Sequence, residues 1–205
     1  MSAVELIGLA ATLSLLAGWR LYFCVFATGF AMQLGWIELP QHLDGLAVLA
    51  NPWVIGAAAI GLVAEFLADK LPWVDSAWDA VHSFVRPVGG ALLALAIVDP
   101  GDPAWQVVAL LMGGGAALFA HGAKAGARAV VNTSPEPFSN VAVSTLEDIL
   151  TGGLLALAFA FPVAGIVIAL LLLALVAALL VLLRRLVLRL SRRRQPAGDG
   201  HSPAG

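Results

Sequence analysis

Long apolar stretches separated by short polar clusters run through nearly the whole chain. Residues 3–37 have the pattern of continuous helix. At about 1.5 Å per residue they would measure about 50 Å, much more than the roughly 30 Å of a bilayer core. We expect a break near Gly18 and Arg20, because glycine is unfavourable inside helices and arginine is costly in lipid. The pattern thus predicts a short segment over 3–17 and a helix over 20–37.

Five further apolar stretches predict helices over residues 52–71, 87–98, 104–131, 144–161 and 163–190. Ser144, with Glu147 three positions later, has the spacing of a capping box and is expected to open a helix. The loop at 38–52 contains two prolines and the acids Glu38 and Asp44, but no lysine or arginine. We therefore expect this loop to face solvent.

A polar connector is expected over residues 72–86, along the membrane interface, where its two tryptophans suit the headgroup layer. It contains Asp75, Asp79 and His82, which share one helical face because they are three or four residues apart. These three side chains are weak candidates for an oxygen-rich metal site. The alternative is an ordinary solvated face, and no other metal site is expected.

The chain also shows internal similarity between residues 52–98 and 104–161. The pentapeptide Leu-Leu-Ala-Leu-Ala at 92–96 recurs at 154–158, and each copy follows a polar bend. Two helical hairpins running in the same direction would be parallel repeats about an axis along the membrane normal. We therefore expect two repeats within one domain.

The composition places these helices in a membrane. Of the 205 residues, 60% are hydrophobic and 12% are charged, and the mean hydropathy is +0.94. A soluble domain carries about 25% charged residues. Nearly continuous apolar sequence favours helices over the alternating strands of a barrel. We expect an all-α, polytopic transmembrane bundle of about six spans, forming one domain over residues 1–190.

The basic residues predict the orientation. Six arginines follow the last apolar stretch, between Arg184 and Arg194, and the predicted outer loops contain no lysine or arginine. By the positive-inside rule the C-terminus is cytoplasmic, in a multi-pass protein of the inner membrane. Residues 191–205 are expected to be a disordered basic tail. Membrane lipids are the expected partners, a homo-oligomer is an open alternative, and nucleic acid is not expected.

Ionisable residues within or beside the apolar stretches are the candidates for a functional site, because charges are expensive there and mark pathways or internal pairs. The candidate solute or ion pathway consists of Arg20, Glu65, Asp69, Arg86, His121, Lys124, Arg128, Glu147 and Asp148. In this interpretation Glu65 and Asp148 bind a cation or a proton. The basic residues counter them or contact an anion, and His121 relays protons near neutral pH.

These candidates also have structural interpretations. Glu65 could be half of a buried ion pair with His121, Lys124 or Arg128 that fixes helix register. Glu147 could complete a helix cap. Arg20 could reach the membrane surface instead of the interior. Arg86 could pair with Asp148, which occupies the matching position of the other repeat. The residues alone leave these alternatives open.

Common catalytic and cofactor motifs do not occur in the chain. The H-E-x-x-H, G-x-S-x-G, P-loop and C-x-x-C patterns are all missing, so no cofactor is expected. The single cysteine, Cys24, excludes an intrachain disulfide. It is expected to be a small buried apolar residue.

Several motifs resemble those of the bacterial membrane family known as domain of unknown function 4126: EFLADKLPWVDSAWD, RPVGGA, HGAKAGAR, and NTSPEPFSN followed by STLED. The resemblance covers about residues 18–161. It implies a small multi-span bacterial membrane protein, without an established activity. The recurring polar positions of the family correspond here to Glu65, Asp69, Lys70, Asp75, Arg86, His121, Lys124, Arg128, Asn140, Glu147 and Asp148.

Three functions stay open, and a non-enzymatic one is favoured. The first is a transporter or channel for a small solute or ion, because repeated hairpins, broken helices and glycine-rich packing build polar sites within membranes. The second is a structural or accessory scaffold whose charges are internal ion pairs. The third is a membrane-embedded enzyme on a lipid-linked substrate, with His82, His121 and the acids as general acid/base candidates.

Overall fold

The computed structural model is helical, without strands, over the residues that it describes, which are 2–39, 41–98, 101–131 and 137–193. The elements are α1 (Ala3–Gln33), the 3₁₀ helix η1 (Gln41–Ala50), α2 (Pro52–Ala68), α3 (Pro72–Leu95), α4 (Pro103–Val131), α5 (Pro137–Ala160) and α6 (Pro162–Arg193). Helices α2 to α6 each begin at a proline, whose fixed φ and missing N–H suit the first helical turn. The predicted all-α fold class is confirmed.

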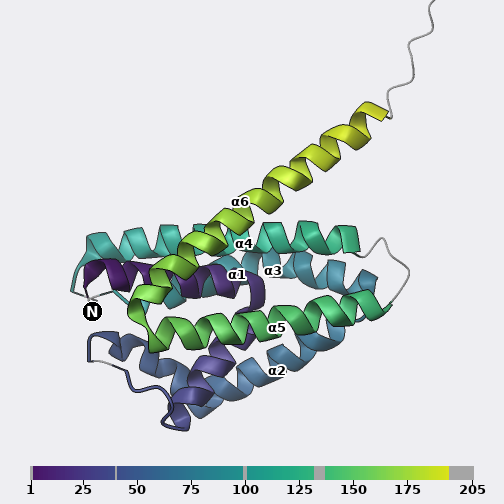
Figure 1. Ribbon diagram of the computed structural model, residues 1–205. Coiled ribbons are helices and arrows are strands. Elements are labelled where there is room, and N and C mark those ends of the chain that lie inside the picture. Colours follow the sequence, from purple (N-terminus) through teal and green to yellow (C-terminus); the bar gives the residue numbers. More distant parts are fainter. Residues whose placement is uncertain (1, 40, 99–100, 132–136, 194–205) are drawn as a thin grey trace, which may run out of the picture.

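The first helix is broken at Arg20 and turns back on itself. Arg20 has φ −145° and ψ 70°, far from helical values. Gly8 packs against Ile166 near the start of α6, and Gly29 packs against Leu49 at the end of η1. Both ends of α1 therefore lie at one end of the bundle, and Arg20 is the tip of a re-entrant hairpin (Figure 1). The predicted break is confirmed.

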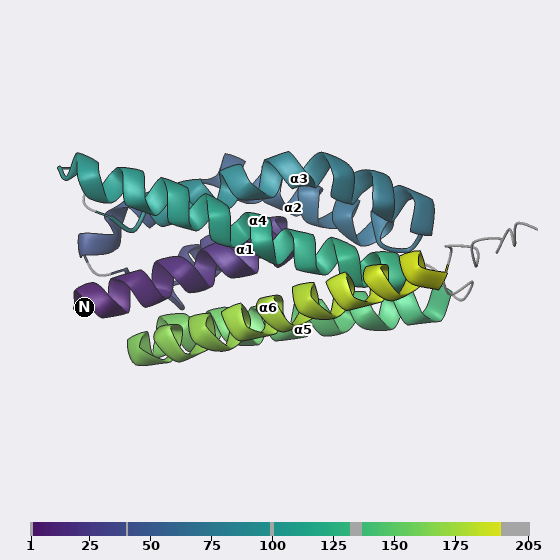
Figure 2. The ribbon, with the colours of Figure 1, turned by 90° about the horizontal axis from the view of Figure 1, so that it is seen from above.

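Helices α2 to α6 run alternately in opposite directions beside this hairpin (Figure 2). The α2–α3 bend, the end of α4, the start of α5 and the end of α6 lie together at what we call the bend end. The N-terminus and the starts of α2, α4 and α6 lie at the opposite, N-terminal end. The two predicted hairpins do run in the same direction, but their origin by duplication stays a prediction.

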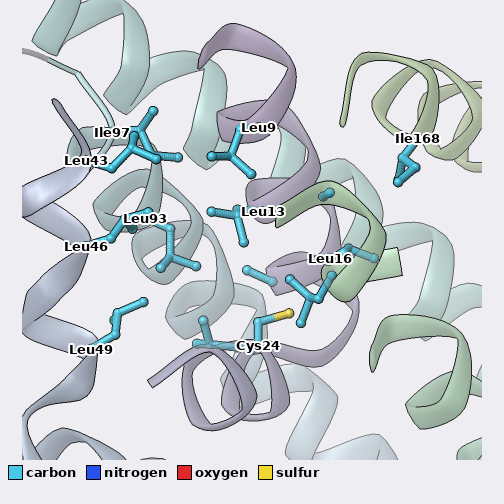
Figure 3. Packing of buried hydrophobic residues seen from close by; sticks show 14 residues of the cluster. Leu9, Leu13, Leu16, Cys24, Leu43, Leu46, Leu49, Leu93, Ile97 and Ile168 are labelled. Atoms are coloured by element: carbon cyan, nitrogen blue, oxygen red, sulfur yellow. The ribbon is translucent and has the colours of Figure 1, made fainter. Parts of the chain in front are cut away.

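The segment predicted to be a solvent-facing loop is largely helical and contributes to the core. Leu43, Leu46 and Leu49 point from η1 towards α1 and α3 and are at most 7% exposed (Figure 3). The prediction was wrong because leucines spaced three residues apart lie on one face of a 3₁₀ helix. Their burial outweighs the flanking proline and acids, which had indicated solvent.

One continuous helix, α3, replaces the predicted interfacial connector and the short helix after it. Pro87 lies inside α3 without ending it, as is tolerated in membrane helices because neighbouring groups satisfy the freed backbone. Asp75, Asp79 and His82 are at most 6% exposed. Their shared face therefore points into the bundle, and the expectation of a solvated face on the surface is wrong.

Four helices, α1, α4, α5 and α6, are long and apolar enough to cross a membrane. The pair of η1 and α2, which is bent by 69°, would be a fifth span. Large apolar side chains face outward on these elements, for example Ile60, Leu111 and Leu171, whereas soluble proteins rarely expose such surface. These features indicate a helical membrane protein with four or five candidate spans, and the predicted number of six stays a prediction.

Two helix boundaries differ from those expected. Helix α5 starts at Pro137 rather than at Ser144, and α6 continues to Arg193. Residues 191–193 of the predicted tail are therefore helical. The remainder of that tail, 194–205, and residues 132–136 before α5 lie outside the described residues.

Small residues bring α1, α3 and α4 into close contact on the N-terminal side of the break. Ser14 donates a hydrogen bond to the carbonyl of Gly90 at 3.0 Å. Gly18 lies against the backbone of Ala117, and Gly90 lies against Gly113. Such residues allow helix backbones to approach closely in membranes. They leave little room between these three helices on this side of Arg20.

Gly18→Ala should therefore destabilise the protein. A Cβ at Gly18 would collide with the backbone of Ala117, which cannot move aside as a side chain can. We expect a loss of about 1–3 kcal/mol in the free energy of unfolding, measured by denaturant unfolding in detergent. Gly122→Ala on α4 is the matched control, because a Cβ there meets open space. Equal stability of the two variants would contradict the close packing.

Candidate functional site

Charged side chains from five helices meet inside the bundle beside the break in α1. We call this group the charged cluster, and it consists of Arg20, Glu65, Asp69, Asp79, Arg86, Lys124, Arg128, Glu147 and Asp148. All are buried except Asp148, which is half-buried. With His121, which contacts Arg86, the structure brings together all nine predicted pathway residues and adds Asp79.

Six members form a closed ring in which acids and bases alternate. The N–O distances around it are 2.7 Å for Arg20–Asp69, 2.9 Å for Asp69–Arg128, 3.7 Å for Arg128–Glu147, 3.9 Å for Glu147–Lys124, 3.2 Å for Lys124–Glu65 and 3.5 Å for Glu65–Arg20. Each charge therefore has an opposite charge on both sides. This arrangement offsets part of the cost of removing the charges from water.

Arg20 is the centre of the charged cluster. Its guanidinium lies within 3.5 Å of carboxylate oxygens from four residues: Glu65 of α2, Asp69 just after α2, and Glu147 and Asp148 of α5. It also donates hydrogen bonds to the carbonyl and the hydroxyl of Ser144, at 3.0 and 2.6 Å. The side chain is 1% exposed, so the alternative in which it reaches the membrane surface is wrong. Its position at the tip of the hairpin lets it contact α2 and α5 together.

The predicted capping box at Ser144 and Glu147 is wrong. Both residues lie inside α5, where Ser144 donates a hydrogen bond to Asp69 Oδ2 at 2.6 Å. The Glu147 carboxylate lies 3.0 Å from Arg20. The three-residue spacing that suggested a cap also places two side chains on one face of a helix. In α5 that face points into the charged cluster.

Asp69 lies just beyond the end of α2, at the bend end. Burial alone would raise the pKa of its carboxyl group, but Lys124, Arg20 and Arg128 lower it more. The hydrogen bond from Ser144 adds to their effect, and the pKa falls to about 2. The surrounding basic side chains thus favour the charged form of Asp69 within the ring.

Arg86 connects the ring to α3, α4 and the break. It donates hydrogen bonds to Glu65 Oε1 at 2.6 Å and to His121 Nδ1 at 2.7 Å. It also reaches the carbonyl of Gly18 at 3.5 Å, close to where the break disrupts the hydrogen bonds of α1. The predicted pair of Arg86 with Asp148 is not found among the described residues, since Asp148 contacts Arg20 at 3.1 Å.

The contacts of His121 determine its protonation state. Arginine only donates hydrogen bonds, so Nδ1 must accept from Arg86 and cannot carry a proton. Nε2 lies 2.9 Å from the carbonyl oxygen of Asp79, which only accepts, so Nε2 carries the hydrogen. His121 is therefore neutral here, and Nε2 cannot take a proton from the nearby hydroxyl of Ser83, 3.2 Å away. A serine nucleophile activated by this histidine does not fit the geometry.

The suggested metal site at Asp75, Asp79 and His82 is wrong. Among the described residues, no group of three or more His, Cys, Asp and Glu side chains is arranged to hold a metal ion. Both ring nitrogens of His82 are engaged within the protein, with the Trp78 carbonyl at 2.7 Å and the Tyr22 hydroxyl at 2.9 Å. The Trp78 ring also stacks on the His82 ring, with centroids 4.3 Å apart.

Sequence reasoning missed several residues of the site. Asp79 was considered only as a metal ligand or a solvated acid, and Ser83 and Tyr22 were not considered. Asp79 and Arg86 are seven residues apart and share a helical face of α3. Both precede Pro87, in the segment expected to lie along the membrane interface, so only the interior position of α3 reveals that this face contributes to the charged cluster.

A cleft reaches the charged cluster from the side of α3 and α4. It has a volume of about 260 Å³ and is lined by Ser76, Asp79, Ala80, Ser83, Ala125, Arg128 and Ala129. The lining lies in the first half of α3 and the last turns of α4, towards the bend end. Asp79 Oδ1 accepts no hydrogen bond among the described residues, and its nearest cation, Arg86, is 3.6 Å away.

The charged cluster contains more acid than base. Its five carboxylates face four cationic side chains. The Oε2 atom of Glu65 is fully buried and has no hydrogen-bond partner within the described part of the chain. Buried carboxylate oxygens without partners are costly. Arg86 Nε likewise has no hydrogen-bond partner among the described residues, so the surplus of one carboxylate, and not the unpartnered atoms, is what favours a small cation or a proton over an anion here.

Comparisons with known proteins assign the chain to a family without assigning a function. A family model described as "Domain of unknown function (DUF4126)" matches residues 7–182. No curated protein and no solved structure matches the chain. The match spans most of the sequence and includes every residue of the charged cluster. The chain therefore belongs to the DUF4126 family of domains of unknown function.

Proposed function

We propose that the protein transports a small cation through the membrane. The observation that carries this proposal is the broken helix α1, whose tip inserts Arg20 into a buried cluster with an excess of acid. Discontinuous helices with charged groups at the break are how many membrane transporters form their binding sites. A helix that served only as an anchor would have no physical need for such a break.

Access to the charged cluster differs between the two ends of the bundle, which also supports transport. The cleft between α3 and α4 opens near the bend end and is lined by two members of the cluster, Asp79 and Arg128. On the other side of Arg20, small residues of α1, α3 and α4 pack closely. A site open to one end and closed to the other is what alternating access requires of one of its states.

The charge balance favours a cation as the transported species. One acid in the cluster has no matching base, and Oε2 of Glu65 and Oδ1 of Asp79 accept no hydrogen bonds among the described residues. A cation moving inward from the cleft would meet Asp79 first, because Asp79 lines the cleft. Glu65 would come next, since Arg86 lies between these two carboxylates and contacts both. The ring of ion pairs could then rearrange around it, since each ring member already has two alternative partners.

We further propose that the bend end faces the cytoplasm of a bacterial inner membrane. Lys70 lies in the bend between α2 and α3 and the arginines of α6 lie in its last turns, both at this end. Four described acids lie outside it: Glu5 in the first turn of α1, Glu38 between α1 and η1, Asp44 in η1 and Asp102 at the start of α4. This distribution agrees with the positive-inside rule.

A structural scaffold is the second candidate, and the closed ring favours it. Paired charges can be retained because they specify one arrangement of helices, without any cargo. An enzyme has less support, because both nitrogens of His121 are engaged by Arg86 and the Asp79 carbonyl. Measurements of ion flux distinguish a transporter from a structural scaffold.

Proteoliposomes should conduct a small cation in a way that depends on Glu65. We expect flux of H⁺, Na⁺ or K⁺ above that of empty liposomes, and at least a tenfold loss in Glu65→Gln, because the substitution removes a buried charge and keeps the shape. Asp79→Asn, at the cleft, should also lower the flux. Glu38→Gln is the matched control, since Glu38 is exposed outside the helices.

Size-exclusion profiles and melting temperatures would show that each variant is folded before flux is compared. Absence of flux for all three ions with folded wild-type protein would contradict cation transport. Flux that is equal in the wild type, Glu65→Gln and Asp79→Asn would contradict the assignment of the pathway.

The cleft should be accessible from one side of the membrane only. We expect a membrane-impermeant thiol reagent to label Ala125→Cys in oriented vesicles from the side that carries the C-terminus. Wild type is the matched control, because the native Cys24 is 1% exposed and should stay unlabelled. Labelling of Ala125→Cys only from the opposite side would contradict the proposed opening.

Arg20→Gln should strongly destabilise the fold, whether the charged cluster forms a transport pathway or only stabilises the helix packing. Removing one partner of a buried ion pair typically costs about 3–5 kcal/mol, because the remaining charge is left uncompensated. Arg20 contacts four carboxylates, so we expect a loss at least of that size in denaturant unfolding. Arg184→Gln, at an exposed position, should change stability by less than about 0.5 kcal/mol. Similar stability of both variants would contradict the central position of Arg20.

A further inference from the structure

The last part of α6 leaves the bundle. The helix packs against α4 as far as Leu183, which lies against Gly126. Beyond that residue α6 projects away from the other helices (Figure 1). Leu182 and Val187 are 59% and 63% exposed, and Arg184, Arg185 and Arg189 are exposed as well. The described part of this chain therefore does not cover this segment, which we call the basic extension (residues 182–189).

The length of α6 places the basic extension at the membrane surface. The uncharged stretch from Pro162 to Leu183 covers about 33 Å at about 1.5 Å per residue. That length matches the roughly 30 Å hydrocarbon core of a bilayer. Arg184 and Arg185 follow directly, so the helix delivers them to the level of the lipid phosphates. Arginines near helix ends reach that level easily, because their side chains are long and flexible.

The basic extension has a mainly basic face and an apolar face. At about 100° per residue, Arg184, Arg185 and Arg189 fall within one arc, which also contains Leu188, and Leu182 and Leu186 begin the apolar arc next to it. Helices with this division lie at the boundary between headgroups and acyl chains, with the apolar face towards the acyl chains. An acidic soluble protein would match the arginines but not the adjoining exposed leucines.

We propose that the basic extension binds the headgroups of anionic phospholipids in the leaflet at the bend end. Three exposed guanidinium groups provide charge complementarity to the phosphates, and arginine can form two parallel hydrogen bonds to each phosphate. The described contacts include no ion pair within the chain for Arg184, Arg185 or Arg189, so these groups are available to lipid. This inference is independent of the proposed cation transport.

The test compares lipid binding by full-length protein variants in detergent. Native mass spectrometry would measure the ratio of bound phosphatidylglycerol to bound phosphatidylcholine for the wild type and for R184Q/R185Q/R189Q. Each basic side chain near an anionic surface strengthens binding about fivefold. The triple variant should therefore lose at least a factor of ten in its preference for phosphatidylglycerol. R184K/R185K/R189K is the matched control, because it keeps the charge and should keep most of the preference.

The wild-type preference should also weaken as ionic strength rises, because salt screens exposed charges. An unchanged preference in the folded triple glutamine variant would overturn the proposal and point to another occupant of this surface. Loss of preference in both triple variants, glutamine and lysine, would overturn the role of charge. The melting temperature of each variant checks folding, and it should stay close to that of the wild type, since the substituted side chains lie outside the bundle.

Discussion

The requirement that the buried guanidinium of Arg20 be neutralised connects nearly every other feature of this structure. An arginine inside a membrane bundle is tolerated only if carboxylates surround it. Here α2 and α5 supply four of them, together with the hydroxyl and carbonyl of Ser144. Those carboxylates in turn require bases, which α3 and α4 supply as Arg86, Lys124 and Arg128. Five helices are thus held in register around one side chain.

The break in α1 and the packing of small residues are two parts of the same arrangement. The hairpin can enter the bundle only because Gly18, Gly90 and Gly113 allow backbones to touch. Apolar side chains of η1, α3 and α6 then surround the first half of α1 (Figure 3). The buried charged groups are consequently confined to the half of the bundle near the bends, and a tightly packed, mainly apolar region lies between them and the N-terminal end. Such a division suits a site that opens to one end at a time.

Local signals in the sequence predicted much of this fold, and long-range packing decided the rest. Apolar length and composition predicted the membrane helices, and the pair of Gly18 and Arg20 predicted the break. The same residues could not show that α1 turns back, because that depends on contacts with Ile166 and Leu49. Pro87 wrongly indicated a helix boundary, and Ser144 with Glu147 wrongly indicated a cap, since both local rules ignore which face is buried.

The candidate residues were found from charge alone, because charge in an apolar stretch has few explanations. Of their pairings, Glu65 with Lys124 was among the alternatives considered and is present. The predicted pair of Arg86 with Asp148 is not found among the described residues, because sequence similarity between halves does not determine which helices are neighbours.

The separation of Arg20 from its partners along the chain has a consequence for biosynthesis. Asp69 lies 49 residues after Arg20 in the sequence, and Ser144 lies 124 residues after Arg20. A chain that is inserted from its N-terminus therefore produces the hairpin long before the helices that neutralise its tip. Placing the uncompensated arginine in lipid at that stage would be costly. The environment that neutralises Arg20 is thus complete only after α5 has been synthesised, although α2 supplies part of it earlier.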